Sequence, residues 1–215
     1  MAEPGAHLDD ALWLLQRGIV CLPLREGGKH LDLAAMGYDP LHRRTMRKDL
    51  KELAFTAIAF HLSQRPPDKA IIERWFGRFR GNIGILGGFR GLLILDFDDA
   101  EAFRRWRALH EDLVRSTPVA KTPTGFHVYL KSTEPIVSSS LHFGWRRVGH
   151  VKSLGGYVAG SPSRLEDGSA YNWLPGQSFD IEPREVGGLA NLSLRPVSFL
   201  KQCYDRVRKR GFFEE

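Results

Sequence analysis

Two aspartates at alternate positions close an aliphatic run at residues 92–99, LLILDFDD. If LLILDF is a strand, Asp96 and Asp98 project from the same face, because side chains alternate along a strand. Like charges held close repel, and burial penalises each of them, so the cluster either meets something positive or sits in open solvent. Divalent metals take hard oxygen ligands, and two metals held this way can activate an attacking oxygen and stabilise a leaving pyrophosphate.

A plain structural role for these acids is the alternative. The strand could end and a helix could begin, with Asp98 or Asp99 as the N-cap of a helix starting at Ala100. That role suits Asp99 well. It suits Asp96 poorly, since Asp96 belongs to the strand itself.

Two later segments carry residues that could bind phosphate. Residues 122–131, TPTGFHVYLK, place His127 on a strand after a tight turn, beside basic residues. Residues 155–163, GGYVAGSPS, combine a flexible turn with small hydroxyl side chains. Taken singly, a histidine of this kind is more often a packed core residue, and such a glycine pair is often only a turn.

Composition narrows the setting. Lys and Arg number 31 against 25 Asp and Glu, a formal charge of +6, which favours polyanionic partners such as nucleic acid or nucleotides. The two cysteines, Cys21 and Cys203, lie far apart, which predicts a reducing compartment and argues against a structural zinc site. No apolar stretch approaches the roughly 20 residues of a membrane span, and the acidic N-terminal segment is no signal peptide. We expect a cytoplasmic protein with no membrane contact.

The elements that must position these residues mix helices and strands without strict alternation, which predicts an α+β fold. Expected helices cover residues 9–17, part of 41–62, 66–79, 99–113 and a basic amphipathic tail at 196–215. Expected strands cover residues 19–24, one or two segments of 116–131, part of 152–163, and 169–174. Residues 82–86 and 92–97 are expected to form a hairpin around the turn GGFRG.

In this order, the pieces resemble the primase–polymerase (prim-pol) domain of the archaeo-eukaryotic primase superfamily, as found in plasmid and phage replication proteins. The likeness runs over about residues 11–173 and includes GGK at 27–29 and GNIGILGG at 81–88. It implies that residues 1–215 form one catalytic domain, with 174–215 as a C-terminal extension. It also implies an RRM-like unit beside a second α/β unit, with the active site in the cleft between them.

The resemblance assigns roles residue by residue. It implies that Asp96 and Asp98 bind the catalytic divalent metals and that His127 contacts the phosphates of the incoming nucleotide. The family's third motif has an acid where this chain has His150, so the chain departs from the pattern at a metal-ligand position. The expected catalytic and metal set is therefore Asp96, Asp98 and His150. The expected nucleotide-binding set is Lys29, Thr124, Gly125, His127, Lys131, Lys152 and Ser161.

His150 leaves three interpretations open. It could be a working ligand that shifts preference towards Mn²⁺ over Mg²⁺, because imidazole suits softer divalent ions. A nearby acid, Asp99, Glu166 or Asp180, could instead take the third place. Alternatively, the site could be degenerate, so that the protein binds nucleotide or nucleic acid without catalysis.

Two main function classes follow. The first is a template-dependent nucleotidyltransferase, acting in replication as primase, DNA polymerase or both by a two-metal mechanism. The second is a non-catalytic binding module of a replication complex, and a metal-dependent nuclease is a distant third. Expected partners are a DNA template and primer, nucleoside triphosphates and a separate helicase, since the chain has no P-loop motif. A basic groove for DNA could draw on the clusters at 42–48, 74–80 and 104–107. The aromatic residues in the last two clusters are better explained as helix core.

Overall fold

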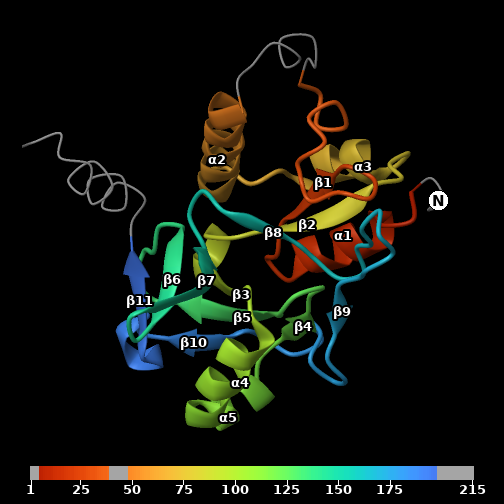
Figure 1. The fold of residues 1–215 in the computed structure, drawn as a ribbon. Helices are drawn as coiled ribbons and strands as arrows, with labels where there is room; N and C mark the ends of the chain where they lie inside the picture. The colour runs from red at the N-terminus through yellow and green to blue at the C-terminus, as the bar shows by residue number, and fades with distance from the viewer. Residues whose placement is uncertain (1–4, 39–47, 198–215) are drawn as a thin grey trace, which may run out of the picture.

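The computed structural model describes residues 5–38 and 48–197, with side chains described from residue 53 in the second range (Figure 1). The chain forms two mixed units, which confirms the α+β class. The smaller sheet has the order β1-β2-β8, and the larger has the order β11-β6-β7-β3-β5-β4-β9, with β10 also pairing with β5. The smaller sheet's strands are β1 (Cys21–Leu24), β2 (Asn82–Leu86) and β8 (Tyr157–Ala159).

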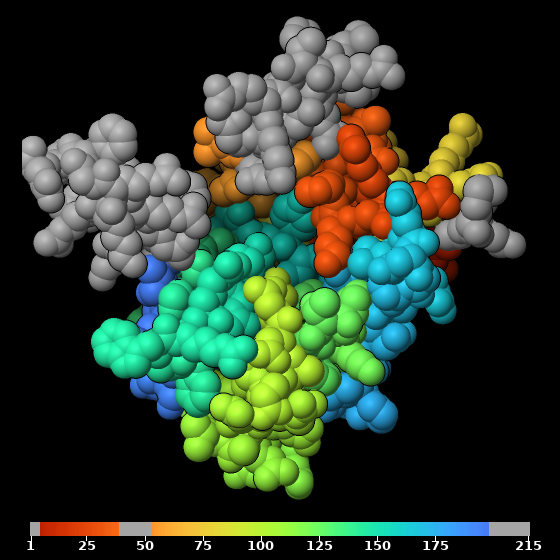
Figure 2. All heavy atoms as spheres, viewed as in Figure 1, coloured from red at the N-terminus to blue at the C-terminus, as the bar shows by residue number. Residues whose placement is uncertain are grey.

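The larger sheet is mostly antiparallel, and β10 adds a parallel pairing to β5. Its strands are β3 (Leu92–Phe97), β4 (Val119–Lys121), β5 (Phe126–Ser132), β6 (Ser139–Phe143), β7 (Arg146–Lys152), β9 (Asn172–Trp173), β10 (Arg184–Val186) and β11 (Leu194–Val197). The described helices are α1 (Leu8–Gln16), α2 (Lys48–Gln64), α3 (Lys69–Phe76), α4 (Ala100–Leu109) and α5 (Glu111–Arg115). None of these helices is long and apolar enough to cross a bilayer. In the space-filling view, the blue-green atoms of the β6–β7 hairpin project at the left edge of the molecule (Figure 2).

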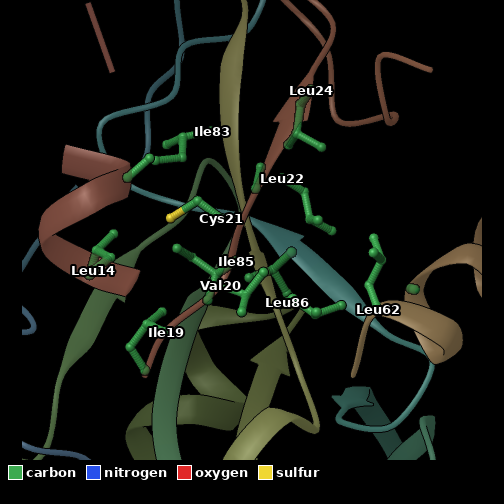
Figure 3. Close-up of a cluster of buried hydrophobic side chains, with 14 of the residues drawn as sticks. Leu14, Ile19, Val20, Cys21, Leu22, Leu24, Leu62, Ile83, Ile85 and Leu86 are labelled. Atoms are coloured by element: carbon green, nitrogen blue, oxygen red, sulfur yellow. The ribbon is translucent and has the colours of Figure 1, made fainter. Parts of the chain in front are cut away.

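The smaller sheet is held by an aliphatic core. Side chains of α1, β1, α2 and β2 converge there, among them Leu14, Leu22, Leu62 and Ile85 (Figure 3). Cys21 is fully buried in this core, and burial raises the pKa of its thiol. Its position makes Cys21 a packing residue of this core.

The central strand of the larger sheet is β3, which lies between β5 and β7. Its apolar residues are buried, and α4 packs against Leu93, Leu95 and Phe97 through Phe103 and Trp106. The Trp106 indole Nε1–H donates to the Leu192 carbonyl over 2.9 Å. The helical aromatics are therefore core residues, as expected. On the outer face of α4, Arg104 and Arg105 pair with Glu101.

The expected hairpin of residues 82–97 is wrong, because β2 and β3 belong to different sheets. NIGIL is buried at every position and pairs with β1 and β8 instead. The chain crosses between sheets at Gly87–Gly88 and crosses back before β8, where Gly87 N–H donates to the Gly156 carbonyl over 2.9 Å. A Cβ on Gly87 would lie 2.8 Å from the Lys152 carbonyl oxygen. Gly87–Gly88 and Gly155–Gly156 thus allow the two chain segments that connect the sheets to lie side by side.

Other boundaries also differ from expectation. The helix at 99–113 is divided at His110 into α4 and α5. Strands β6, β7, β10 and β11 were not expected, because their exposed polar residues hide the alternation that marks a strand. The expected basic tail helix at 196–215 is wrong at residues 196–197, which belong to β11, and the rest of it lies outside the described residues. Most of the basic cluster at 42–48 also lies outside them.

Candidate metal and nucleotide site

Three neighbouring strands bring three titratable side chains into line. Asp96 on β3 is paired in register with His127 on β5 and with His150 on β7. The His127 Nε2 atom lies 3.2 Å from Asp96 Oδ1, and the His150 Nδ1 atom lies 4.0 Å from Asp96 Oδ2. Paired residues on adjacent strands face the same side of a sheet, so the carboxylate lies between two imidazoles.

Asp98 joins this row from just beyond the end of β3. Its N–H donates to the Val148 carbonyl over 2.9 Å, which extends the pairing with β7. Ligand atoms of Asp96, Asp98 and His150 all lie within 4.8 Å of one another. The expected shared face of the two aspartates is therefore confirmed. Two carboxylates and one imidazole are a donor set that fits a divalent cation.

The charges favour an ionised Asp96 beside a neutral His150. Burial raises the pKa of Asp96, but the His127 hydrogen bond and the nearby Lys152 charge outweigh it and hold the pKa below its usual value. Burial lowers the pKa of His150, and Lys152 lowers it further against the opposing effect of the two aspartates. A neutral imidazole retains a lone pair, which a metal ligand requires.

Arg147 restricts how that lone pair can be used. One guanidinium nitrogen lies 2.8 Å from His150 Nε2 and 3.7 Å from Asp98 Oδ2. Since arginine has no acceptor, Nε2 must accept, and the proton of a neutral ring then sits on Nδ1, facing the carboxylates. Metal binding through Nδ1 therefore requires a tautomer change and release of Arg147.

A bulge explains why Arg147 faces the site. Leu141 pairs with Gly149 and His142 pairs with Arg147, so Val148 has no partner on β6. Val148 is buried in the core behind the sheet, and the extra residue turns Arg147 to the side of His150. Simple alternation from His150 would have placed Arg147 on the opposite face, so sequence reasoning missed it.

We call Asp96, Asp98, His127 and His150 the acidic row. A pocket of about 390 Å³ lies against it. Its lining comes from both sheets: from the loop after β1, from α2 and β8 on one side, and from β3, the turn before β5 and the end of β7 on the other. The volume falls within the roughly 300–1,000 Å³ of small-molecule sites. Two lysines, Lys29 and Lys152, line it together with the aspartates.

Local contacts position Lys29 and the turn before β5, both of which border the pocket. The Asn82 side chain donates to the Gly28 carbonyl over 3.0 Å, which holds the loop that carries Lys29. The Lys29 ammonium lies 5.9 Å from the centre of the Tyr171 ring, a pocket residue that sequence reasoning also missed. The Thr122 hydroxyl accepts from Gly125 N–H over 2.8 Å and so closes the turn before β5.

Most of the expected site residues are brought together, but some are not. Asp96, Asp98, His127, Thr124, Lys29 and Lys152 line the pocket, and His150 lies beside it in the metal group. Gly125 has a packing reason of its own, since a Cβ there would lie 1.9 Å from the Phe97 carbonyl oxygen. Lys131 lies opposite Leu92, four residues beyond His127, and is not among the lining residues. Ser161 lines a different pocket, with Trp13 and Trp173.

The three acids considered as substitutes for His150 are engaged elsewhere. Asp99 caps α4 through the Glu101 N–H at 2.7 Å and pairs with Arg146 at 2.9 Å. Glu166 packs against Gly27, and the Asp180 carboxylate accepts a hydrogen bond from the Ser178 hydroxyl. Among the described residues, the group that could hold a metal contains none of them.

Comparison with known families gives a match over residues 11–189 to the bifunctional DNA primase/polymerase, N-terminal (Prim-Pol) family. This match covers most of the chain, including the smaller sheet, every strand of the larger sheet except β11, and Asp96, Asp98, His127 and His150. No curated protein matches the chain.

Proposed function

This chain belongs to the Prim-Pol family of bifunctional DNA primase/polymerase N-terminal domains, and we propose that it is a template-dependent nucleotidyltransferase that makes primers, extends them, or both. The observation that carries the proposal is the group of Asp96, Asp98 and His150 beside a pocket that also holds Lys29 and Lys152. Carboxylates for metal and cations for a triphosphate are the parts that nucleotidyl transfer requires.

The residues divide the work by their chemistry. Asp96, Asp98 and His150 would hold the divalent metal, which when bound activates the primer hydroxyl and stabilises the pyrophosphate that leaves. Lys29 and Lys152 neutralise phosphate charge from opposite sides of the pocket, one from each sheet unit. His127 donates to Asp96 and lines the pocket, where a phosphate oxygen could share the same N–H.

The larger sheet is the catalytic, RRM-like unit in this proposal, and the smaller sheet is the second unit. The pocket between them is the active-site cleft, because its lining is drawn from both. The substrates are a DNA template with its primer and nucleoside triphosphates, and a helicase acts as a separate chain. Mn²⁺ supports the reaction better than Mg²⁺, because imidazole replaces one hard oxygen donor.

A catalytically degenerate binding module is the second candidate. The observation in its favour is Arg147, whose guanidinium lies at His150 and Asp98, where a metal would need the same atoms. In that case the cationic pocket would bind nucleotide or nucleic acid, and no bond would be made.

An extension assay separates the two candidates. Wild-type protein is incubated with a labelled primer on four templates that differ in the first unpaired base, with each nucleotide in turn and with Mg²⁺ or Mn²⁺. The nucleotidyltransferase adds the complementary nucleotide on each template, faster with Mn²⁺. A reaction without primer then tests priming. Nucleotide and DNA binding with no addition under either metal would establish the binding module.

A further inference from the structure

The tip of the β6–β7 hairpin carries a tryptophan in solvent. Trp145 is 93% exposed, whereas the other four tryptophans of the chain are buried or half-buried. The hairpin loop is the pair Gly144–Trp145, with Gly144 at a φ of 60°. Glycine with positive φ at the first loop position is the pattern of a type II′ turn. This turn holds the indole away from the sheet. Because the ring stays in solvent, it contributes little to the hydrophobic stabilisation of the fold.

One arginine contacts this ring, and two more follow it in the chain. The Arg195 guanidinium lies 4.7 Å from the centre of the Trp145 ring and also donates to the Gly144 carbonyl. Arg146 and Arg147 follow directly in the chain, and both side chains are more than half exposed. A cation over one face fixes the ring while its high exposure leaves the other face open.

The same strand connects this tip to the candidate catalytic site. Trp145 precedes His150 by five residues, which spans roughly 16 Å of strand. Arg147 lies between them and reaches both His150 and Asp98. About 16 Å corresponds to roughly five base steps of duplex rise, so a strand bound in the pocket region would pass the tip within a few nucleotides.

We propose that Trp145, with Arg195 behind it and Arg146 beside it, is a stacking platform for the single-stranded DNA template. This inference rests on the proposed function, and it identifies where the template strand would contact the protein outside the pocket. An aromatic face beside arginines is the chemistry that binds single strands without sequence preference, since every base has a π-face and every nucleotide a phosphate. A protein partner is less well matched, because its apolar surface would bring no charge to meet three arginines.

Binding without catalysis tests the platform. A fluorescein-labelled 20-nucleotide oligothymidylate is titrated, without nucleotide, against wild type, Trp145→Ala, Trp145→Phe and Leu109→Ala, followed by anisotropy. Leu109 is a matched control because it is also an exposed apolar residue, at 63%, on α4. We expect about tenfold weaker binding for Trp145→Ala and near-wild-type binding for Leu109→Ala. Trp145→Phe should recover most of the loss, because phenylalanine also stacks.

Salt dependence separates stacking from charge. Arg195→Gln should lower the slope of log affinity against log salt concentration by about one, whereas Trp145→Ala should leave it unchanged. Wild-type affinity in Trp145→Ala, or a Trp145→Phe variant as weak as the alanine variant, would overturn the platform. If DNA binding depends on Trp145 while the wild type adds no nucleotide, the platform stands and the nucleotidyltransferase proposal fails.

Discussion

The Nε2 atom of His127 lies 3.2 Å from Oδ1 of Asp96, across directly paired positions of β5 and β3. On its other side, His127 Nδ1 lies 3.4 Å from the Tyr129 hydroxyl. Tyr129 donates to Nδ1, and Nε2–H then donates to the carboxylate, which fixes the ring. One imidazole thus connects a buried tyrosine to the candidate metal site.

His127→Ala should weaken nucleoside triphosphate binding by roughly tenfold or more, since hydrogen bonds to charged groups contribute about 1.5–3 kcal/mol. DNA binding should change little, because the proposed DNA contacts lie at the β6–β7 hairpin and not at His127. Titrations of a non-hydrolysable nucleotide and of labelled DNA measure the two losses separately. His127→Gln is the companion variant, since it keeps a donor and fills the site. Equal loss of both ligands in both variants would show a packing role alone.

Arg147→Met should tighten Mn²⁺ binding in the absence of nucleotide by up to about fivefold. The substitution removes a cation that lies at His150 and Asp98, and an exposed ion pair contributes up to about 1 kcal/mol. Electron paramagnetic resonance of free Mn²⁺ gives the affinity. Arg146→Met is the control, because Arg146 pairs with Asp99 outside the metal group. Weaker Mn²⁺ binding in Arg147→Met would mean that Arg147 organises the ligands.

His150→Asp should raise Mg²⁺-supported nucleotide addition towards the Mn²⁺ level. A third carboxylate adds negative charge and a hard oxygen, on which Mg²⁺ depends more than Mn²⁺ does. Metal titrations of the extension rate for both proteins provide the comparison. An unchanged ratio of Mg²⁺ to Mn²⁺ activity would remove His150 from the ligand set.

Gly149→Ala should destabilise the protein by about 1–3 kcal/mol, the usual cost of overpacking. A Cβ at Gly149 would lie 1.8 Å from the Asp96 carbonyl oxygen, so β3 and β7 would have to separate at the metal group. Activity should therefore fall along with stability. Urea unfolding measures the change, with Gly28→Ala as the control, whose nearest contact would be 3.6 Å. A Gly149→Ala variant as stable as Gly28→Ala would contradict the close approach.

The acidic row was predictable because its signal is local. LLILDF is a buried strand, and alternation alone puts Asp96 and Asp98 on one face. The cap role of Asp99 is also local, and its side chain accepts from Glu101 N–H as expected. Lys29 and Lys152 were implied by the family resemblance, and both line the pocket.

What sequence reasoning missed depends on long-range pairing. NIGIL followed by a glycine-rich turn is typical of a hairpin, yet β2 finds its partners in β1 and β8. Arg147 faces the site only because Val148 forms a bulge, and a bulge leaves no mark in the polar pattern of β7. Trp145 lies in a hairpin whose two strands were themselves not expected.

The most direct test of metal-dependent catalysis at the acidic row is the single-turnover rate of one nucleotide addition. Wild type is compared with Asp96→Asn and Asp98→Asn at saturating Mn²⁺, with Tm as the check on folding. Asparagine keeps the shape of the side chain and removes its charge, so we expect each variant to stay folded. We expect the rate to fall at least about a hundredfold, as when an enzyme loses one group that stabilises its transition state. Near-wild-type addition by either folded variant would contradict the assignment of these two carboxylates to the catalytic metal.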